Sequence, residues 1–117
     1  MHTWDRQSPI YQQLADRLAA GLLQGQWSEG QPMASVRALA TQHLLNPLTV
    51  SRALQQLSDQ GLLKHRRGLG LFVVAGAQAS LRQQLREQFL STEWPRLRER
   101  LRRLDIGAEQ LDWTTPA

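Results

Sequence analysis

The stretch from Asn46 to Leu57 constrains the fold of this chain more than any other. Asparagine is a preferred N-cap residue, and Pro47 suits the first helical position because the missing N–H of proline is not needed there. Behind this start, apolar residues recur at the spacing of one helix face, at Val50, Ala53, Leu54 and Leu57. The stretch therefore predicts a short amphipathic helix whose apolar face must pack on the rest of the chain.

The other face of this helix is polar and carries one exposed leucine. Its candidate recognition residues are Leu48, Thr49, Ser51, Arg52 and Gln55. Such side chains suit the major groove of DNA, which presents hydrogen-bond acceptors and thymine methyl groups. Leu48 is either a contact to a thymine methyl group or an exposed residue without a role. Gln55 lies a turn further from the helix start that would enter the groove, so its role stays open.

Two helices are predicted before this one. Ser8-Pro9 repeats the cap-then-proline start and opens a helix to about residue 24. A turn-rich segment, Gly25–Pro32, follows, with Trp27 as its apolar anchor. Ser35 then caps a second helix, which ends at a tight turn before Asn46. The expected inward stripes are Ile10, Leu14, Leu18, Gly21 and Leu22 in the first helix and Val36, Leu39, Ala40, His43 and Leu44 in the second. Two short helices joined by a tight turn form a helix-turn-helix.

A β-hairpin is predicted after Gly61. Residues 62–65 and 71–74 have strand composition, and the loop of residues 66–70 between them contains Arg66, Arg67 and Gly68. Basic residues beside such a tip suit phosphate contacts, although they are also ordinary strand-end charges. Residues 1–75 are therefore predicted to form a winged helix-turn-helix, mainly α with a small β-wing.

Residues 76–117 are expected to form a separate dimerisation segment. A first helix is predicted from Ser80 to about Leu90, and Ser91 or Thr92 would cap a second helix to give a helical hairpin. Two amphipathic helices of this size need a partner surface, which favours a second copy of the chain over a ligand pocket beside Trp94. The expected dimer residues are Leu81, Leu85, Phe89, Trp94, Leu97, Leu101 and Leu104.

Several motifs in residues 9–74 resemble the N-terminal DNA-binding domain of GntR-family bacterial transcription regulators. They are Pro-Ile-Tyr-Gln-Gln-Leu at 9–14, Ser-Val-Arg-Ala-Leu-Ala at 35–40, the stretch at 46–57, and Gly-Leu-Leu with Arg-Arg-Gly-Leu-Gly-Leu-Phe-Val within 61–73. The short segment after the wing is similar to the YtrA-type subfamily, whose paired C-terminal helices serve dimerisation. This resemblance also implies control of a transporter operon.

The resemblance implies roles for individual residues. Arg37 would contact the DNA backbone or a guanine edge, and Gly68 would lie near the minor groove. Thr49, Ser51 and Arg52 would face DNA from the recognition helix. The chain departs from the family pattern at Ala34, where proline is usual, and at Leu69, where lysine is usual in the wing. It also departs at Leu44, which would force a left-handed conformation on a leucine.

Charge and composition are consistent with a nucleic-acid partner. The net charge is +4 and the pI is about 11.0. Residues 76–117 hold seven arginines against six acidic residues, so the distal arginines are interpreted as a solvated face. The chain has no cysteine and three scattered histidines, and it lacks a glycine-rich phosphate loop, so we expect no enzyme activity, no cofactor and no metal. Without a signal peptide or a long apolar run, the expected location is the cytoplasm, on the nucleoid when bound.

The leading hypothesis is a homodimeric repressor that binds a palindromic operator in double-stranded DNA and has no membrane partner. No small-molecule effector is identified by the sequence, and activation is not distinguished from repression. The alternative is a protein-interaction adaptor built on a winged-helix scaffold. A truncated piece of a longer regulator is a third possibility, which the complete pair of C-terminal helices disfavours.

Overall fold

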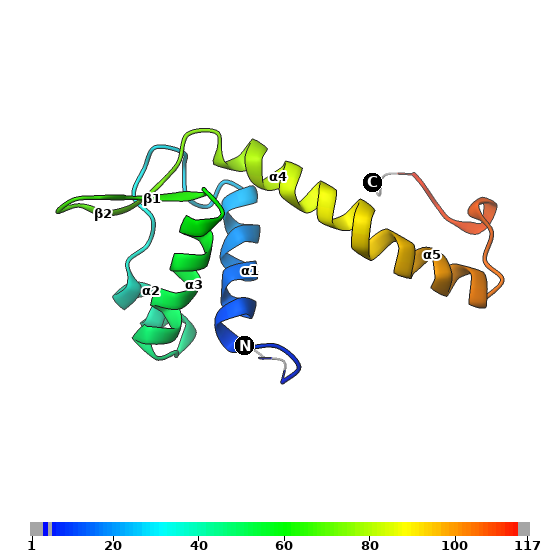
Figure 1. Cartoon of the computed structure of the whole chain (residues 1–117), viewed down its shortest axis with the longest axis horizontal. Coiled ribbons are helices and arrows are strands. Elements are labelled where there is room, and N and C mark those ends of the chain that lie inside the picture. Colours follow the sequence, from blue (N-terminus) through cyan, green and yellow to red (C-terminus); the bar gives the residue numbers. More distant parts are fainter. Residues whose placement is uncertain (1–3, 5, 115–117) are drawn as a thin grey trace. The chain divides into compact units, whose positions relative to one another are not determined.

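The computed structural model describes Trp4 and residues 6–114 of the chain. They fall into two compact units, the first within Met1–Arg82 and the second within Gln83–Ala117. The elements, labelled in Figure 1, are α1 (Ile10–Leu23), α2 (Val36–His43), α3 (Pro47–Asp59), β1 (Leu63–Arg66), β2 (Gly70–Val73), α4 (Ala77–Gln88), the π-helical turn η1 (Phe89–Glu93), α5 (Trp94–Arg103) and the 3₁₀ turn η2 (Ala108–Gln110). This order confirms the predicted class, which is mainly α with a β-wing.

The core of the first unit lies between α1 and α3, which are neighbours in Figure 1. The predicted apolar stripes of both helices are buried, except that Ile10 lies at the edge and is partly exposed. Trp27 packs against this core and fills the space beside Gly21, as expected of an anchor. The principal buried side chains of the two helices are Leu14, Leu18, Leu22, Val50, Ala53, Leu54 and Leu57.

Two of the three helix caps predicted in the first unit are present. The Ser35 hydroxyl accepts a hydrogen bond from the amide of Ala38 at 3.1 Å. Asn46 Oδ1 accepts one from the amide of Leu48 at 2.8 Å, with Pro47 in the first turn. The start predicted for the first helix is wrong. Pro9, not Ser8, occupies the N-cap position of α1, and no side chain caps that helix.

Leu44 forms the turn between α2 and α3. Its φ of 55° and ψ of 49° are left-handed, as the departure from the family pattern predicted. Its placement on the inward stripe of the second helix is wrong, because its side chain is 88% exposed. The helix ends at His43, so Leu44 no longer follows the helical period, and Leu45 packs against the core instead.

The wing consists of β1 and β2 in antiparallel register, from Leu63 opposite Val73 to Arg66 opposite Gly70. Both strands begin or end within one residue of the predicted bounds. The end of the segment Gly25–Pro32, expected only as a turn-rich connection, also pairs with β2, as does Met33 after it. The amide of Gly30 donates to the carbonyl of Val73 at 2.8 Å, and the amide of Met33 donates to that of Leu71 at 2.9 Å.

The C-terminal helices are present, but two expectations about them are wrong. Leu81, assigned to the dimer surface, is buried in the core of the first unit, since α4 begins earlier than predicted, at Ala77. Ser91 and Thr92 do not start a new helix. They lie within η1, and Gln88 and Trp94 on either side are both right-handed helical, so the chain does not reverse there to form a hairpin.

Candidate nucleic-acid interface

The polar face of α3 lies on the surface of the first unit. Leu48 is 78% exposed, and Ser51, Arg52 and Gln55 are exposed beside it. Thr49 is half-buried. The fixed apolar face on the other side of the helix holds this surface outward, so the structure brings all five predicted recognition residues of α3 together.

Two of these side chains already have partners within the chain. The guanidinium carbon of Arg52 lies over the ring of Tyr11, 4.1 Å from its centroid. Gln55 Nε2 donates to Oδ1 of Asp59 at 2.9 Å, toward the C-terminal end of the helix. Arg52 is therefore held at the start of the helix, whereas Gln55 is directed away from it.

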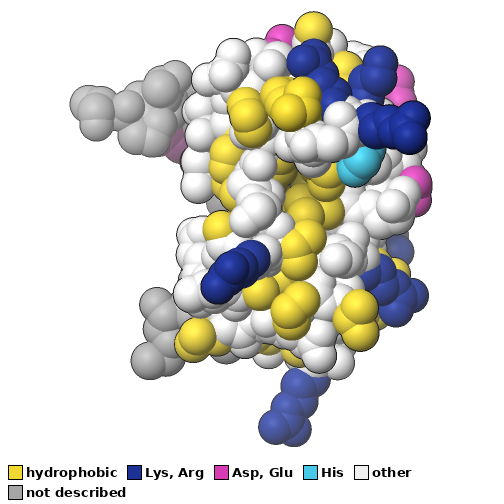
Figure 2. Space-filling view, turned by 90° about the vertical axis from the view of Figure 1, so that its left-hand side faces the viewer, with side chains coloured by type: hydrophobic (Ala, Val, Ile, Leu, Met, Phe, Trp, Pro, Cys, Tyr) yellow, Lys and Arg dark blue, Asp and Glu magenta, His cyan; other side chains and the backbone are white. Residues whose placement is uncertain are grey.

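A groove of about 330 Å³ runs between α3 and the wing. Its polar lining comes from Ser51, Gln55 and Ser58 of α3 and from His65 of β1, and Leu71 of β2 contributes an apolar wall. This placement gives Leu71 a role in shaping the groove, whereas Leu69 is exposed beside the tip. Figure 2 shows the face from which the wing extends, with Lys, Arg and His side chains gathered near exposed hydrophobic ones.

The two arginines of the wing lie at its tip. The pairing places Arg66 on the strand face opposite to that of His65, and the Arg66 guanidinium stacks on Phe72 at 4.5 Å from the ring centroid. Arg67 and Gly68 are exposed in the loop, where Gly68 has a φ of +76° that favours glycine. Arg37 is exposed in the first turn of α2. The structure thus presents Arg37, the α3 face and the wing arginines on one unit.

Sequence reasoning left two residues, Tyr11 and His65, out of the candidate set. Side chains alternate along a strand, so His65 lies on the same side as the buried Leu63. The sequence could therefore have predicted that His65 faces the helices. Tyr11 gave only a weak signal, as an aromatic residue one turn before Leu14. Its contact with Arg52 depends on how α1 and α3 pack.

The second unit carries an apolar hollow of about 470 Å³. It is lined by Phe89, Leu90, Trp94, Leu97, Leu101, Leu111 and Trp113. Of the predicted dimer residues, Leu85, Phe89, Leu97 and Leu104 are also exposed, Leu104 at 60%. These side chains form the exposed apolar surface of this unit.

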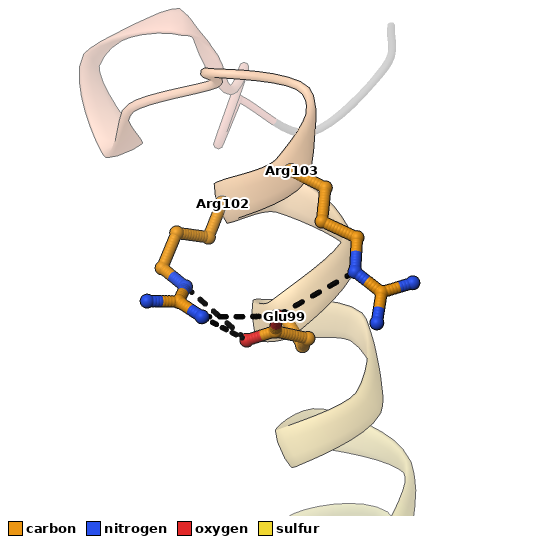
Figure 3. Close-up of polar contacts among 3 residues, drawn as sticks. All are labelled: Glu99, Arg102 and Arg103. Carbon is orange, nitrogen blue, oxygen red and sulfur yellow. Dashed lines mark hydrogen bonds and ion pairs between the residues drawn. The ribbon is translucent and has the colours of Figure 1, made fainter.

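The arginines of α5 behave as a solvated face. Glu99 accepts hydrogen bonds from Arg102 and pairs with Arg103, at nitrogen–oxygen distances of 2.9 Å and 3.5 Å (Figure 3). Both arginine side chains are more than three-quarters exposed, so these pairs stabilise the helix only weakly. Within Trp4 and residues 6–114, no group of three His, Cys, Asp or Glu side chains is placed to hold a metal, and no helix is long and apolar enough to cross a membrane.

Residues 10–73 match the family described as bacterial regulatory proteins, gntR family. The chain belongs to the GntR family. The matched region runs from the start of α1 to the end of β2, so it contains the helix-turn-helix and the wing. The family consists of regulatory proteins, which confirms the prediction of a transcription regulator rather than an enzyme.

Individual GntR relatives agree with this assignment. The chain is 35% identical over 74 residues to the HTH-type transcriptional repressor YtrA of Bacillus subtilis, which covers 63% of this chain and 57% of that protein. The chain therefore spans little more than half the length of that relative. A GntR-family regulator from Listeria monocytogenes has a TM-score of 0.76 at 25% identity and covers 92% of each chain. A GntR-family structure from Bacteroides thetaiotaomicron has a TM-score of 0.71 at 34% identity, covering 87% of this chain and 88% of that one.

Proposed function

We propose that this GntR regulator is a transcriptional repressor that binds a palindromic DNA operator as a homodimer in the cytoplasm. The observation that carries the proposal is the exposed polar face of α3, presented beside a basic wing on the same unit. The similarity of the chain to the YtrA repressor of Bacillus subtilis supports repression over activation. The resemblance to YtrA-type regulators further favours a transporter operon as the target, which transcript levels in a deletion strain would test.

In this proposal α3 enters the major groove and reads base edges with its first two turns. Leu48 meets a thymine methyl group, and Arg52 donates to a guanine. Arg37, Arg66 and Arg67 bind phosphates and so set the register, with Gly68 allowing the tip to approach the minor groove. Binding then weakens steeply with salt, with log K falling by roughly 0.9 per phosphate neutralised for each tenfold rise in salt.

The dimer in this proposal forms through the exposed apolar surface of the second unit. The range predicted for it, residues 76–117, narrows accordingly, because Leu81 packs in the core of the first unit and the exposed apolar side chains of this segment lie in residues 85–113. Two copies that pair through the same surface are related by a twofold axis, so the two recognition helices meet inverted half-sites. Burial of Leu97 and Leu104 is the driving force, because both are exposed in the single chain.

The role of Arg52 is tested by Arg52→Ala. The variant should lose about 1–3 kcal/mol of discrimination per half-site at a guanine, measured by titration of paired duplexes that differ at that base. Arg67→Ala is the matched control, because a phosphate contact lowers affinity for all sequences alike. Unchanged sequence preference in Arg52→Ala would remove that residue from base recognition.

The role of the second unit is tested by Leu97→Glu, which places a charge in the apolar surface. We expect monomers in analytical ultracentrifugation and loss of binding to a full operator, because the two half-sites are no longer bound together. Arg98→Glu, a neighbouring change on the exposed arginine face, should remain dimeric. A dimeric Leu97→Glu variant would refute this interface. If no DNA sequence is bound by the wild type, the adaptor alternative becomes the better account.

A further inference from the structure

We infer that Tyr11 is a positioning residue, which holds the Arg52 guanidinium ready to read a guanine at the start of α3. The inference rests on the proposed function, since it concerns how one recognition residue is oriented. Tyr11 lies on α1, outside the helix-turn-helix, and it is not among the predicted DNA-binding residues.

The contact joins two helices whose relative position is fixed by the core. The Arg52 guanidinium carbon is 4.1 Å from the centroid of the Tyr11 ring. One turn after Tyr11, Leu14 is fully buried, and two residues before Arg52, Val50 is fully buried. Because α1 and α3 pack together through these side chains, the half-buried Tyr11 ring has a fixed position beneath the exposed Arg52 side chain.

Stacking on Tyr11 leaves the N–H donors of the Arg52 guanidinium free of any hydrogen bond to the ring. The group is planar, and its five N–H donors point outward in the plane. A ring that covers the flat face therefore attracts the cation without accepting any of its hydrogen bonds. The edge remains able to donate two parallel hydrogen bonds to O6 and N7 of guanine. Holding the side chain beforehand reduces the conformational freedom that it loses on binding.

The space in front of this pair suits a base edge. Tyr11 and Arg52 line an open hollow of about 330 Å³ together with Ile10, Leu48 and Thr49. The hollow lies where the first turns of α1 and α3 meet, the end of the recognition helix that enters the groove. Its apolar wall at Leu48 suits a thymine methyl group beside the guanine. Tyr11 thus both supports the Arg52 guanidinium and lines the hollow in which the neighbouring base would lie.

The test uses the full chain and the duplex that the wild type selects from a random pool. Binding of Tyr11→Phe, Tyr11→Leu, Arg52→Ala and the double variant Tyr11→Leu/Arg52→Ala is measured on this duplex and on duplexes with single G·C pairs changed to A·T. Tyr11→Phe keeps an aromatic face and should retain the wild-type preference. Tyr11→Leu should reduce discrimination about two- to fivefold per half-site at the guanine that Arg52 reads, and at no other position. In the Arg52→Ala background, Tyr11→Leu should have no further effect.

Three results would overturn the inference. Equal weakening on all duplexes would indicate a structural role for Tyr11, and a loss that persists without Arg52 would indicate an independent contact. A loss in Tyr11→Phe would indicate a contact through the hydroxyl group. If Tyr11→Leu lowers the melting temperature, Tyr11→Met takes its place. If the wild type selects no sequence, the proposed function fails together with the inference, whereas an effect of Arg52→Ala without any effect of Tyr11 variants overturns the inference alone.

Discussion

Replacing Leu44 with glycine should stabilise the protein, although it removes a large apolar side chain. Leu44 holds a φ of 55° and a ψ of 49° in the turn that leads into the recognition helix. For a side chain with a Cβ this conformation costs roughly 1–2 kcal/mol, which glycine avoids. Glycine also has greater conformational freedom in the unfolded chain, which lowers the free energy of unfolding by about 0.4–1 kcal/mol.

The side chain itself contributes little, because 88% of its surface is exposed. The net expectation for Leu44→Gly is therefore a gain of about 0.5–1 kcal/mol in the free energy of unfolding. Urea unfolding followed by circular dichroism measures it, with all variants at one protein concentration so that dimerisation does not contribute to the difference.

Ala38→Gly, in the right-handed part of the neighbouring helix α2, is the matched control. It should lose about 0.5–1 kcal/mol, because glycine there gains freedom in the unfolded chain without relieving strain. Opposite signs for the two glycine substitutions are the expected result. A lower urea midpoint for Leu44→Gly with an unchanged slope would show that the left-handed turn is not a source of strain.

Further predictions concern the core and the start of α4. Gly21→Ala should destabilise by about 1–3 kcal/mol in urea unfolding, since its Cβ would lie 2.7 Å from Cζ3 of Trp27, and wild-type stability would contradict this packing. Leu57→Ala should cost about 2–5 kcal/mol, and a loss below 1 kcal/mol would show that the site is not a rigid core. The Glu29 carboxylate accepts hydrogen bonds from the backbone amides of Gly76 and Gln78, which hold its pKa below the ordinary 4.5. Its stabilisation is present above that value and is lost as pH falls through the lowered pKa, so Glu29→Gln should show a smaller acid-induced loss, and an equal loss would contradict the contact.

Features set by local sequence were predictable. The apolar stripes around Val50 and Leu14 appear as buried helix faces because a helical period alone decides which side chains share a side. The caps at Ser35 and Asn46 involve residues two or three positions apart, so the sequence contains both partners. The wing followed in the same way from two short apolar runs and the loop between them.

Features set by contacts distant in sequence were not predictable. The stack of Arg52 on Tyr11 exists only because α1 and α3 pack together, and no spacing rule joins these positions. Leu81 continues the period of the C-terminal helix, but Ala77 and Leu81 reach the core of the first unit. Ser91 and Thr92 have N-cap chemistry, yet the backbone continues through them as a π-helical turn. For Leu81 and for Ser91 and Thr92, tertiary packing or a continuous helical backbone overrides the local sequence signal.

Selection of duplexes from a random pool by this chain tests the central claim most directly. The account predicts an enriched inverted repeat, with a guanine in each half-site whose enrichment disappears in Arg52→Ala and persists in Arg67→Ala. A pool without enrichment, or a half-site that Arg52→Ala leaves unchanged, would contradict the assignment of the α3 face as the surface that reads DNA.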